Sequence, residues 1–212
     1  MKSTSRAKET TARSAMIVGD KSRFAIESEI TKAYVHPGVR ALGLFLIHAA
    51  GRCYGVRAPD ATLLACSFDA IANRITRRGN HTAPFAAEPD AAKIADAFRD
   101  VVYAPDQEGK VFFGIPQPEF YGHFDSGRLV WATDGDEAFD DGSYVLQFDV
   151  ADRVRLIAFR SCSEGYHHAP GTLSDVWLEA GEFYQILEKW RAAFEAEWAS
   201  APKIHEADIV WH

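Results

Sequence analysis

The chain has 212 residues, enough for one large domain or two small ones, and its 47% hydrophobic and 25% charged residues argue against global disorder. Residues 1–15 carry four basic side chains and one acid, so a net charge of −7 leaves −10 for the remainder. This balance argues against nucleic acid and anionic lipid as direct partners, and it is compatible with a cationic protein partner.

Residues 1–15 are rich in Ser, Thr, Ala, Lys and Arg, contain no aromatic residue, and are expected to form a disordered extension. Patterned sequence begins at Met16, which is also a candidate translation start. The alternation of apolar and polar residues over 24–30 predicts a strand with one wet face. Residues 41–50 predict a more buried strand, and a turn at Gly51 leads into 53–57 as a hairpin.

The segment that follows is expected to be partly helical. Residues 62–68 fit either a strand or a helix, and a short helix from Asp69 is expected to end at Gly79. A second helix is predicted to begin at Pro89, because proline suits the first helical position. Residues 111–115 predict a strand, followed by a proline-bounded link.

The last third of the chain shows the clearest patterns. Residues 129–133 predict a strand, and residues 144–150 and 154–159 predict a hairpin. Apolar and aromatic side chains at helical spacing predict a long amphipathic helix near the C-terminus: Phe183, Ile186, Leu187, Trp190, Phe194 and Trp198. Together the elements predict one α+β domain over residues 16–200, with a mostly antiparallel sheet, about three helices and a tail at 201–212.

The sequence lacks signals for export or for a redox site. No apolar run reaches 18 residues, and residues 1–15 contain no apolar stretch of signal-peptide length. Cys53, Cys66 and Cys162 form no C-x-x-C pair and are expected to be reduced thiols. These observations predict a cytoplasmic protein.

The stretch DGDEAFDDGS between two predicted strands concentrates five acids in ten residues: Asp134, Asp136, Glu137, Asp140 and Asp141. It could hold a metal ion, face a basic partner, or be a solvated turn. A helix–loop–helix calcium site needs oxygen ligands at positions 1, 3 and 5, Gly at 6 and Glu at 12, and three of these five checks fail here. We therefore expect a loop that faces a partner protein. The alternative of a solvated turn without a partner remains open.

Catalytic motifs are weak. The sequence contains no phosphate-binding P-loop, dinucleotide-binding, nucleophile-elbow or H-E-x-x-H motif. Adjacent His167 and His168 could serve a metal or acid–base chemistry, although neighbouring side chains on extended backbone point in opposite directions. His48 lies in an apolar strand and is interpreted as a core histidine. No cofactor and no enzymatic activity are expected.

The opening MIVGDKSRFAIESEI, residues 16–30, resembles the start of the immunity 42 family of bacterial polymorphic-toxin systems. The resemblance continues through residues 54–69, 134–159 and 175–178 and the aromatic final helix, covering about residues 16–200. It implies a protein that binds and neutralises a cognate toxin domain, including toxins of contact-dependent inhibition systems. It supplies no catalytic or toxin-contacting residues.

A basic toxin such as a nuclease acting on tRNA or DNA would suit the acidic loop. Two other hypotheses remain open at this point. One is a small metal-assisted hydrolase that uses the acidic loop with His167 or His168, and the other is a regulatory interaction module.

Overall fold

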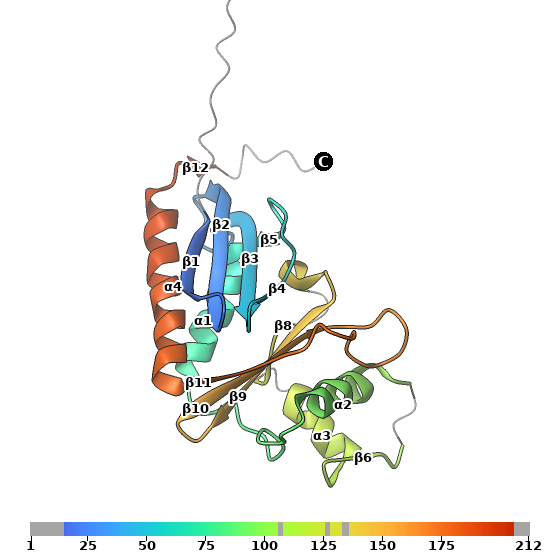
Figure 1. Cartoon of the computed structure of the whole chain (residues 1–212). Coiled ribbons are helices and arrows are strands. Elements are labelled where there is room, and N and C mark those ends of the chain that lie inside the picture. Colours follow the sequence, from blue (N-terminus) through green and yellow to red (C-terminus); the bar gives the residue numbers. More distant parts are fainter. Residues whose placement is uncertain (1–14, 106–107, 126–127, 133–135, 206–212) are drawn as a thin grey trace, which may run out of the picture.

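The computed structural model describes residues 15–105, 108–125, 128–132 and 136–205. Over these residues the fold is α+β, as predicted, and consists of two main sheets, a small hairpin and four α-helices (Figure 1). Within the described residues, no helix is long and apolar enough to cross a membrane.

The first sheet is built around the N-terminal strands. Its members are β1 (Met16–Asp20), β2 (Phe24–Tyr34), β3 (Ala41–Ala49), β4 (Arg52–Tyr54), β5 (Thr62–Leu63) and β12 (Lys203–Ile204). All pairs are antiparallel except the pairing of β12 with β2. The predicted hairpin into β4 is confirmed. The first residues beyond 200 therefore join the sheet, although the sequence predicted a tail there.

The second sheet has the order β11-β10-β9-β8 and is antiparallel throughout. Its strands are β8 (Val130–Ala132), β9 (Ser143–Val150), β10 (Arg153–Arg160) and β11 (Ser174–Glu179). The predicted hairpin is confirmed, because β9 and β10 pair in continuous register from Val150 opposite Arg153. Ala151 in its two-residue turn has φ 53°, the left-handed backbone that such turns require.

The four helices are α1 (Leu64–Thr76), α2 (Ala91–Tyr103), α3 (Gln117–Asp125) and α4 (Ala180–Ser200). Helix α1 begins five residues before the predicted Asp69. Helix α2 does not begin at Pro89, because the Asp90 side chain accepts a hydrogen bond from Ala92 N and caps the helix.

Residues 111–115 do not form the single predicted strand. They divide between β6 (Val111–Phe112) and β7 (Ile115–Pro116), a small hairpin around Phe113 and Gly114, both at positive φ. Helix α3 follows directly where the sequence predicted only a link. Its Phe120 and Phe124 are buried one helical turn apart.

Two hydrophobic cores share the second sheet as a wall. The first lies between the first sheet, α1, α4 and one face of β9–β10, where Val145 and Leu156 point. The second core lies beneath α2 and α3 and contains Leu146, Phe148 and Ile157 from the opposite face. Because both faces are covered, β9 and β10 are almost fully buried. In Figure 1 the first sheet and α4 lie on one side of β9–β10, and α2 and α3 lie on the other.

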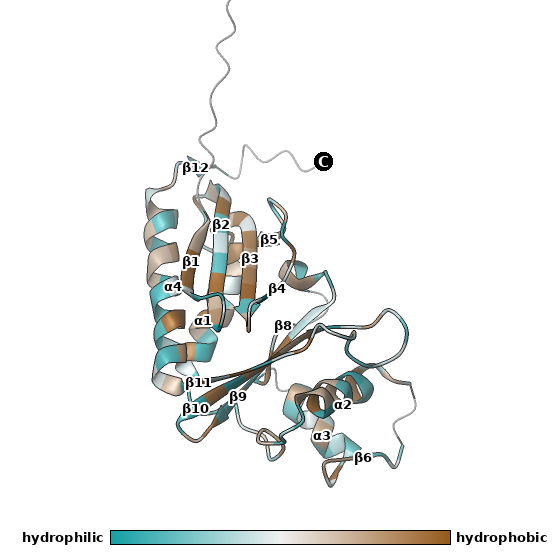
Figure 2. Ribbon diagram, in the orientation of Figure 1, coloured by the Kyte–Doolittle hydropathy of each residue, from teal (hydrophilic) through white to brown (hydrophobic). Residues whose placement is uncertain are grey.

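The C-terminal helix confirms the prediction of a long amphipathic element. Trp190 and Phe194 are fully buried against the first sheet and α1, whereas Glu188 and Glu195 are exposed. Figure 2 shows polar and apolar residues interleaved along α4, the pattern of a helix with one covered side.

Candidate functional site

The acidic loop between β8 and β9 is anchored to the first core. Asp134 lies outside the described residues, and the loop is described from Asp136 onward. Residues Glu137–Phe139 form a single 3-10 turn, η1. Phe139 is 1% exposed and packs edge-on against Phe45 with ring centroids 6.2 Å apart. The acidic stretch is therefore held to the protein by an aromatic side chain from its own middle.

The backbone of β4 and the residues after it hold η1 from the other side. Val56 N donates a hydrogen bond to the Ala138 carbonyl oxygen at 2.8 Å, and Ala138 is fully buried. Gly55 has φ 111°, and a Cβ there would lie 2.9 Å from that same oxygen. Glycine at position 55 is thus needed both for the backbone angle and for the close approach.

Two of the predicted site residues hold the loop itself. Asp136 caps η1, because its carboxylate accepts a hydrogen bond from Ala138 N at 3.0 Å. The Asp141 carboxylate accepts hydrogen bonds from Ser143 N and from Arg160 Nε, each at 3.1 Å. These two acids therefore have a structural role that the sequence interpretation did not assign.

The other two described acids face solvent. Glu137 and Asp140 are exposed, and their side chains make no hydrogen bond or ion pair within the described part of the chain. Burial raises the pKa of Asp136, and the negative charges of Glu137 and Asp140 raise it further, against its hydrogen bond from Ala138 N. Keeping Asp136 ionised at neutral pH therefore works against folding.

The first turns of α1 extend this acidic surface. Burial raises the pKa of the Cys66 thiol, and the charges of Asp136, Glu137 and Asp69 add to the effect, so all three acids act on the same part of the surface. Asp69 is exposed. We call the combination of Asp69, Asp136, Glu137 and Asp140 the acidic patch.

The two histidines considered for metal chemistry do not meet the acidic loop in a metal site. His168 Nδ1 lies 2.7 Å from Asp96 Oδ1 on α2, and His167 is exposed. Across the described residues, no group of three or more His, Cys, Asp or Glu side chains is placed to hold a metal ion. His48 is a core histidine as predicted, because it is 6% exposed and its Nε2 lies 2.8 Å from Glu27 Oε2.

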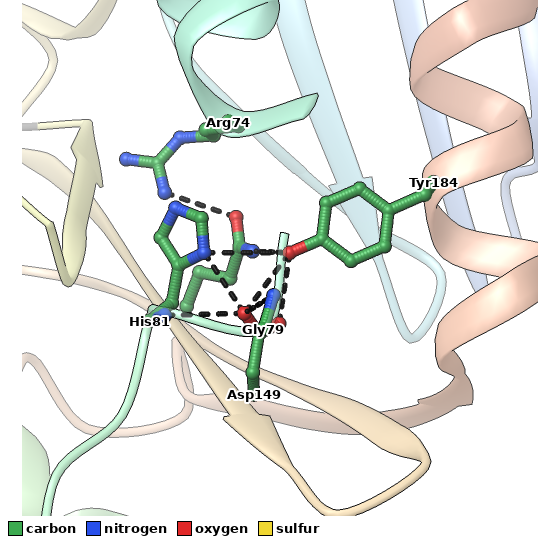
Figure 3. Close-up of polar contacts among 6 residues, drawn as sticks. Arg74, Gly79, His81, Asp149 and Tyr184 are labelled. Atoms are coloured by element: carbon green, nitrogen blue, oxygen red, sulfur yellow. Dashed lines mark hydrogen bonds and ion pairs between the residues drawn. The ribbon is translucent and has the colours of Figure 1, made fainter. Parts of the chain in front are cut away.

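A buried polar network, which the sequence interpretation missed, lies where α1, β9 and α4 meet (Figure 3). The Tyr184 hydroxyl on α4 donates to Asp149 on β9 at 2.9 Å. Asp149 Oδ2 also accepts from Gly79 N at 2.8 Å and lies 3.0 Å from His81 Nδ1. Burial raises the pKa of Tyr184, and the Asp149 charge adds to this, so the phenol stays protonated.

Arg74 joins the same network through Gln147. Gln147 Nε2 donates to the Tyr184 hydroxyl at 3.0 Å, and its Oε1 accepts from Arg74 Nη1 at 2.9 Å. No periodicity reveals these contacts, because the partners are up to 103 residues apart in the chain. The network ties together α1, the segment after it, β9 and α4.

The fold is similar to the crystal structure of CdiI from Burkholderia dolosa AUO158, with a TM-score of 0.52 and 13% sequence identity. The similarity covers 84% of this chain and 99% of that chain. At this identity the likeness shows the fold alone, and no curated protein matches the chain. A family model, however, matches residues 16–193, beginning at the same Met16 where patterned sequence starts. This match spans most of the sequence and confirms the resemblance, so the chain belongs to the immunity protein 42 family.

Proposed function

We propose that the protein binds a cognate toxin domain in the cytoplasm and neutralises it by contact, without catalysis. Membership of the immunity protein 42 family carries this proposal. The net charge of −7 favours a basic toxin as the partner and disfavours direct contact with nucleic acid or an anionic membrane.

The acidic patch is the surface that we propose meets the toxin, with Asp134 as a further predicted contact. The buried Phe139 and Ala138 anchor η1 to the core, so Glu137 and Asp140 extend into solvent from an anchored turn. A prearranged charged surface loses little conformational entropy on binding and accelerates encounter with an opposite charge. A nuclease that attracts a polyanion through a basic cleft would present such a charge.

The electrostatics of the patch support a role outside folding. The pKa of Asp136 is raised by its burial and by its acidic neighbours, so its negative charge makes the folded state less stable at neutral pH. Glu137 and Asp140 add repulsion and form no bond with the described chain that would offset it. Charge that opposes folding is better explained by recognition than by stability.

Co-expression tests the function directly. The toxin domain encoded in the reading frame beside this gene should arrest growth when produced alone, and this protein should restore growth and co-purify with the toxin. Growth arrest that persists despite soluble immunity protein, with no complex formed, would overturn the proposal.

The contribution of the patch is tested by association kinetics. The double variant Glu137→Gln/Asp140→Asn removes the two exposed charges and leaves Asp136 and Asp141 to hold the loop. Association with the toxin should slow severalfold at low salt and approach the wild-type rate at high salt, where charges are screened. The matched control, Glu188→Gln/Glu195→Gln, removes two exposed charges from α4.

The control should change the rate much less than the patch variant does. Equal rates for wild type and both variants at low salt would exclude the acidic patch as the contact surface. That outcome would leave toxin neutralisation itself intact, because growth rescue measures it separately.

A further inference from the structure

A small pocket next to Arg74 is lined by two arginines and by no acid among the described residues. It lies between the C-terminal half of α1, the segment after that helix, and β8, and its volume is about 210 Å³. Arg74, Arg77, Asn73 and His81 line it on one side, and Val130 and Trp131 form an apolar wall. The described lining contains two guanidinium groups and no acid, although the chain as a whole carries −7. We call it the basic pocket.

Arg74 is a buried cation whose guanidinium carbon lies over the Trp131 ring, 5.0 Å from the ring centroid. It is 6% exposed, and the hydrogen bonds of its guanidinium run to neutral acceptors, Gln147 Oε1 at 2.9 Å and the Val130 carbonyl oxygen at 2.5 Å. Its Nε is buried without a hydrogen-bond partner in the described structure. Burial lowers the pKa of Arg74 to about 9, Tyr184 and the Asp149 carboxylate oppose this shift, and the charge of Arg77 adds to it. Buried charges are normally paired, yet Arg74 forms no ion pair among the described residues, and the nearby carboxylate of Asp149 accepts its hydrogen bonds from Tyr184 and Gly79 instead.

The position of Arg74 is fixed by the network behind it. Gln147 can accept from Arg74 only with its oxygen turned that way, and its amide nitrogen is committed to the Tyr184 hydroxyl. His81, which also lines the pocket, is held through Nδ1 by Asp149 (Figure 3). Arg74 and His81 are therefore oriented before any ligand arrives, which reduces the entropic cost of binding.

A neighbouring pocket beside Tyr184 and Asp149 differs from the basic pocket because acids also line it. It is larger, about 310 Å³, and its lining mixes Arg78 and Arg153 with the acids Asp149 and Asp152. Its lining thus contains acids as well as guanidinium groups, and Arg153 Nε also lies 3.9 Å from Glu179 Oε1. In the basic pocket, by contrast, the guanidinium of Arg77 forms no hydrogen bond or ion pair with the described residues.

We propose that the basic pocket binds a phosphate-class oxyanion, either inorganic phosphate or the phosphoryl group of a small phosphorylated molecule. A phosphate carries a charge of about −1.5 to −2 at neutral pH, which balances Arg74 and Arg77 together, whereas a carboxylate would balance only one. Guanidinium groups suit such anions because they present paired N–H donors. The volume admits a group of this size and leaves an open mouth beside exposed Asn73 and Arg77. The inference is independent of the toxin.

Binding is measured on the full chain by calorimetric titration and by thermal unfolding, with sodium chloride keeping the ionic strength constant. Inorganic phosphate and sulfate should bind saturably and raise the melting temperature, since both are tetrahedral oxyanions. Adenosine 5′-monophosphate distinguishes the two sources. Tighter binding than phosphate supports a phosphorylated small molecule, and weaker binding supports the free anion.

Arg77→Gln should weaken phosphate binding at least about tenfold, because it removes a charged donor from an exposed position without disturbing the network. Arg52→Gln makes the same chemical change at an exposed site on β4 and should leave binding unchanged. Two results would overturn the proposal. One is the absence of saturable binding beyond the chloride control, and the other is acetate binding as tightly as phosphate, which would indicate a carboxylate site.

Discussion

Trp190 is the side chain whose loss should damage the fold most clearly. It lies at the centre of the buried side of α4, is fully buried, and stacks on Phe194 with ring centroids 5.2 Å apart. Phe45 of β3 meets its ring edge-on at 5.3 Å. Its indole Nε1 donates to Ser28 Oγ on β2 at 3.0 Å. Trp190→Ala therefore creates a cavity and leaves the buried Ser28 hydroxyl without its hydrogen-bond donor.

The magnitude follows from these two losses. Truncating a fully buried tryptophan to alanine costs about 3–5 kcal/mol, and leaving the Ser28 hydroxyl without its partner adds roughly 1 kcal/mol. A domain of ordinary stability has about 5–15 kcal/mol in total. With a urea dependence of about 2 kcal/mol per molar, the midpoint should fall by roughly 2–3 M.

Urea unfolding followed by circular dichroism measures the effect, and Trp177→Ala is the control. Trp177 on β11 is half-buried, with Arg153 and Arg155 over its ring at about 5 Å, so its loss should cost only about 1 kcal/mol. Trp190→Phe should fall between the two alanine variants, because it keeps most of the ring volume and loses the hydrogen bond to Ser28. If Trp190→Ala and Trp177→Ala shift the midpoint equally, the buried side of α4 has been misassigned.

Three further predictions concern charge and the N-terminus. The bidentate hydrogen bond from Arg57 holds the pKa of Glu27 well below its usual range, against the effect of burial. The ionised Glu27 therefore stabilises the fold fully above about pH 4.5, and this stabilisation is lost as the pH falls below that value. Glu27→Gln should therefore cost about 2 kcal/mol at pH 7 and markedly less at pH 3, measured by urea unfolding at both pH values; a constant difference would contradict this. Asp136→Asn should keep the hydrogen bond from Ala138 N and leave the melting temperature at pH 7 unchanged or higher, because the raised pKa of Asp136 makes its ionised form unfavourable. Asp136→Ala removes this cap and should lower the free energy of unfolding by about 1 kcal/mol. Deleting residues 1–15 should change the melting temperature little, and a fall of many degrees would show that this segment packs on the fold.

Much of the fold was predictable from periodicity. The β9–β10 hairpin and α4 were recognised because each has a long, regular apolar pattern. The acidic loop was also correctly placed between two strands. These features depend on neighbours in sequence, which a single sequence reveals directly.

Features that depend on distant partners were not predictable. Helix α3 contains Gly122 and a proline in its first turn and has little polar–apolar alternation, yet Phe120 and Phe124 pack into the second core and stabilise it. The pairing of β12 with β2 joins residues about 170 positions apart. Short elements of this kind form because tertiary contacts outweigh weak local preference.

The site was predictable only in part, for the same reason. The acidic composition of the loop was evident, but which of its acids hold the loop and which face solvent was not. Asp141 is partnered by Arg160 from β10, and η1 is anchored by Phe139 against Phe45 of β3. The Arg74 network also escaped detection, since its polar residues come from separate elements and show no shared spacing.

The position of α4 has a consequence for how the protein is made. This helix comes near the end of the chain and packs beside β1, β2 and α1 (Figure 1), where its aromatic residues complete their core. During translation the N-terminal strands emerge first and must wait, with their apolar face uncovered, until residue 190 and beyond have left the ribosome. At roughly 5–20 residues per second this wait lasts on the order of 10–30 s. A newly synthesised molecule is therefore fully folded only after its last helix appears, and protection of the cell by fresh synthesis would lag by that interval.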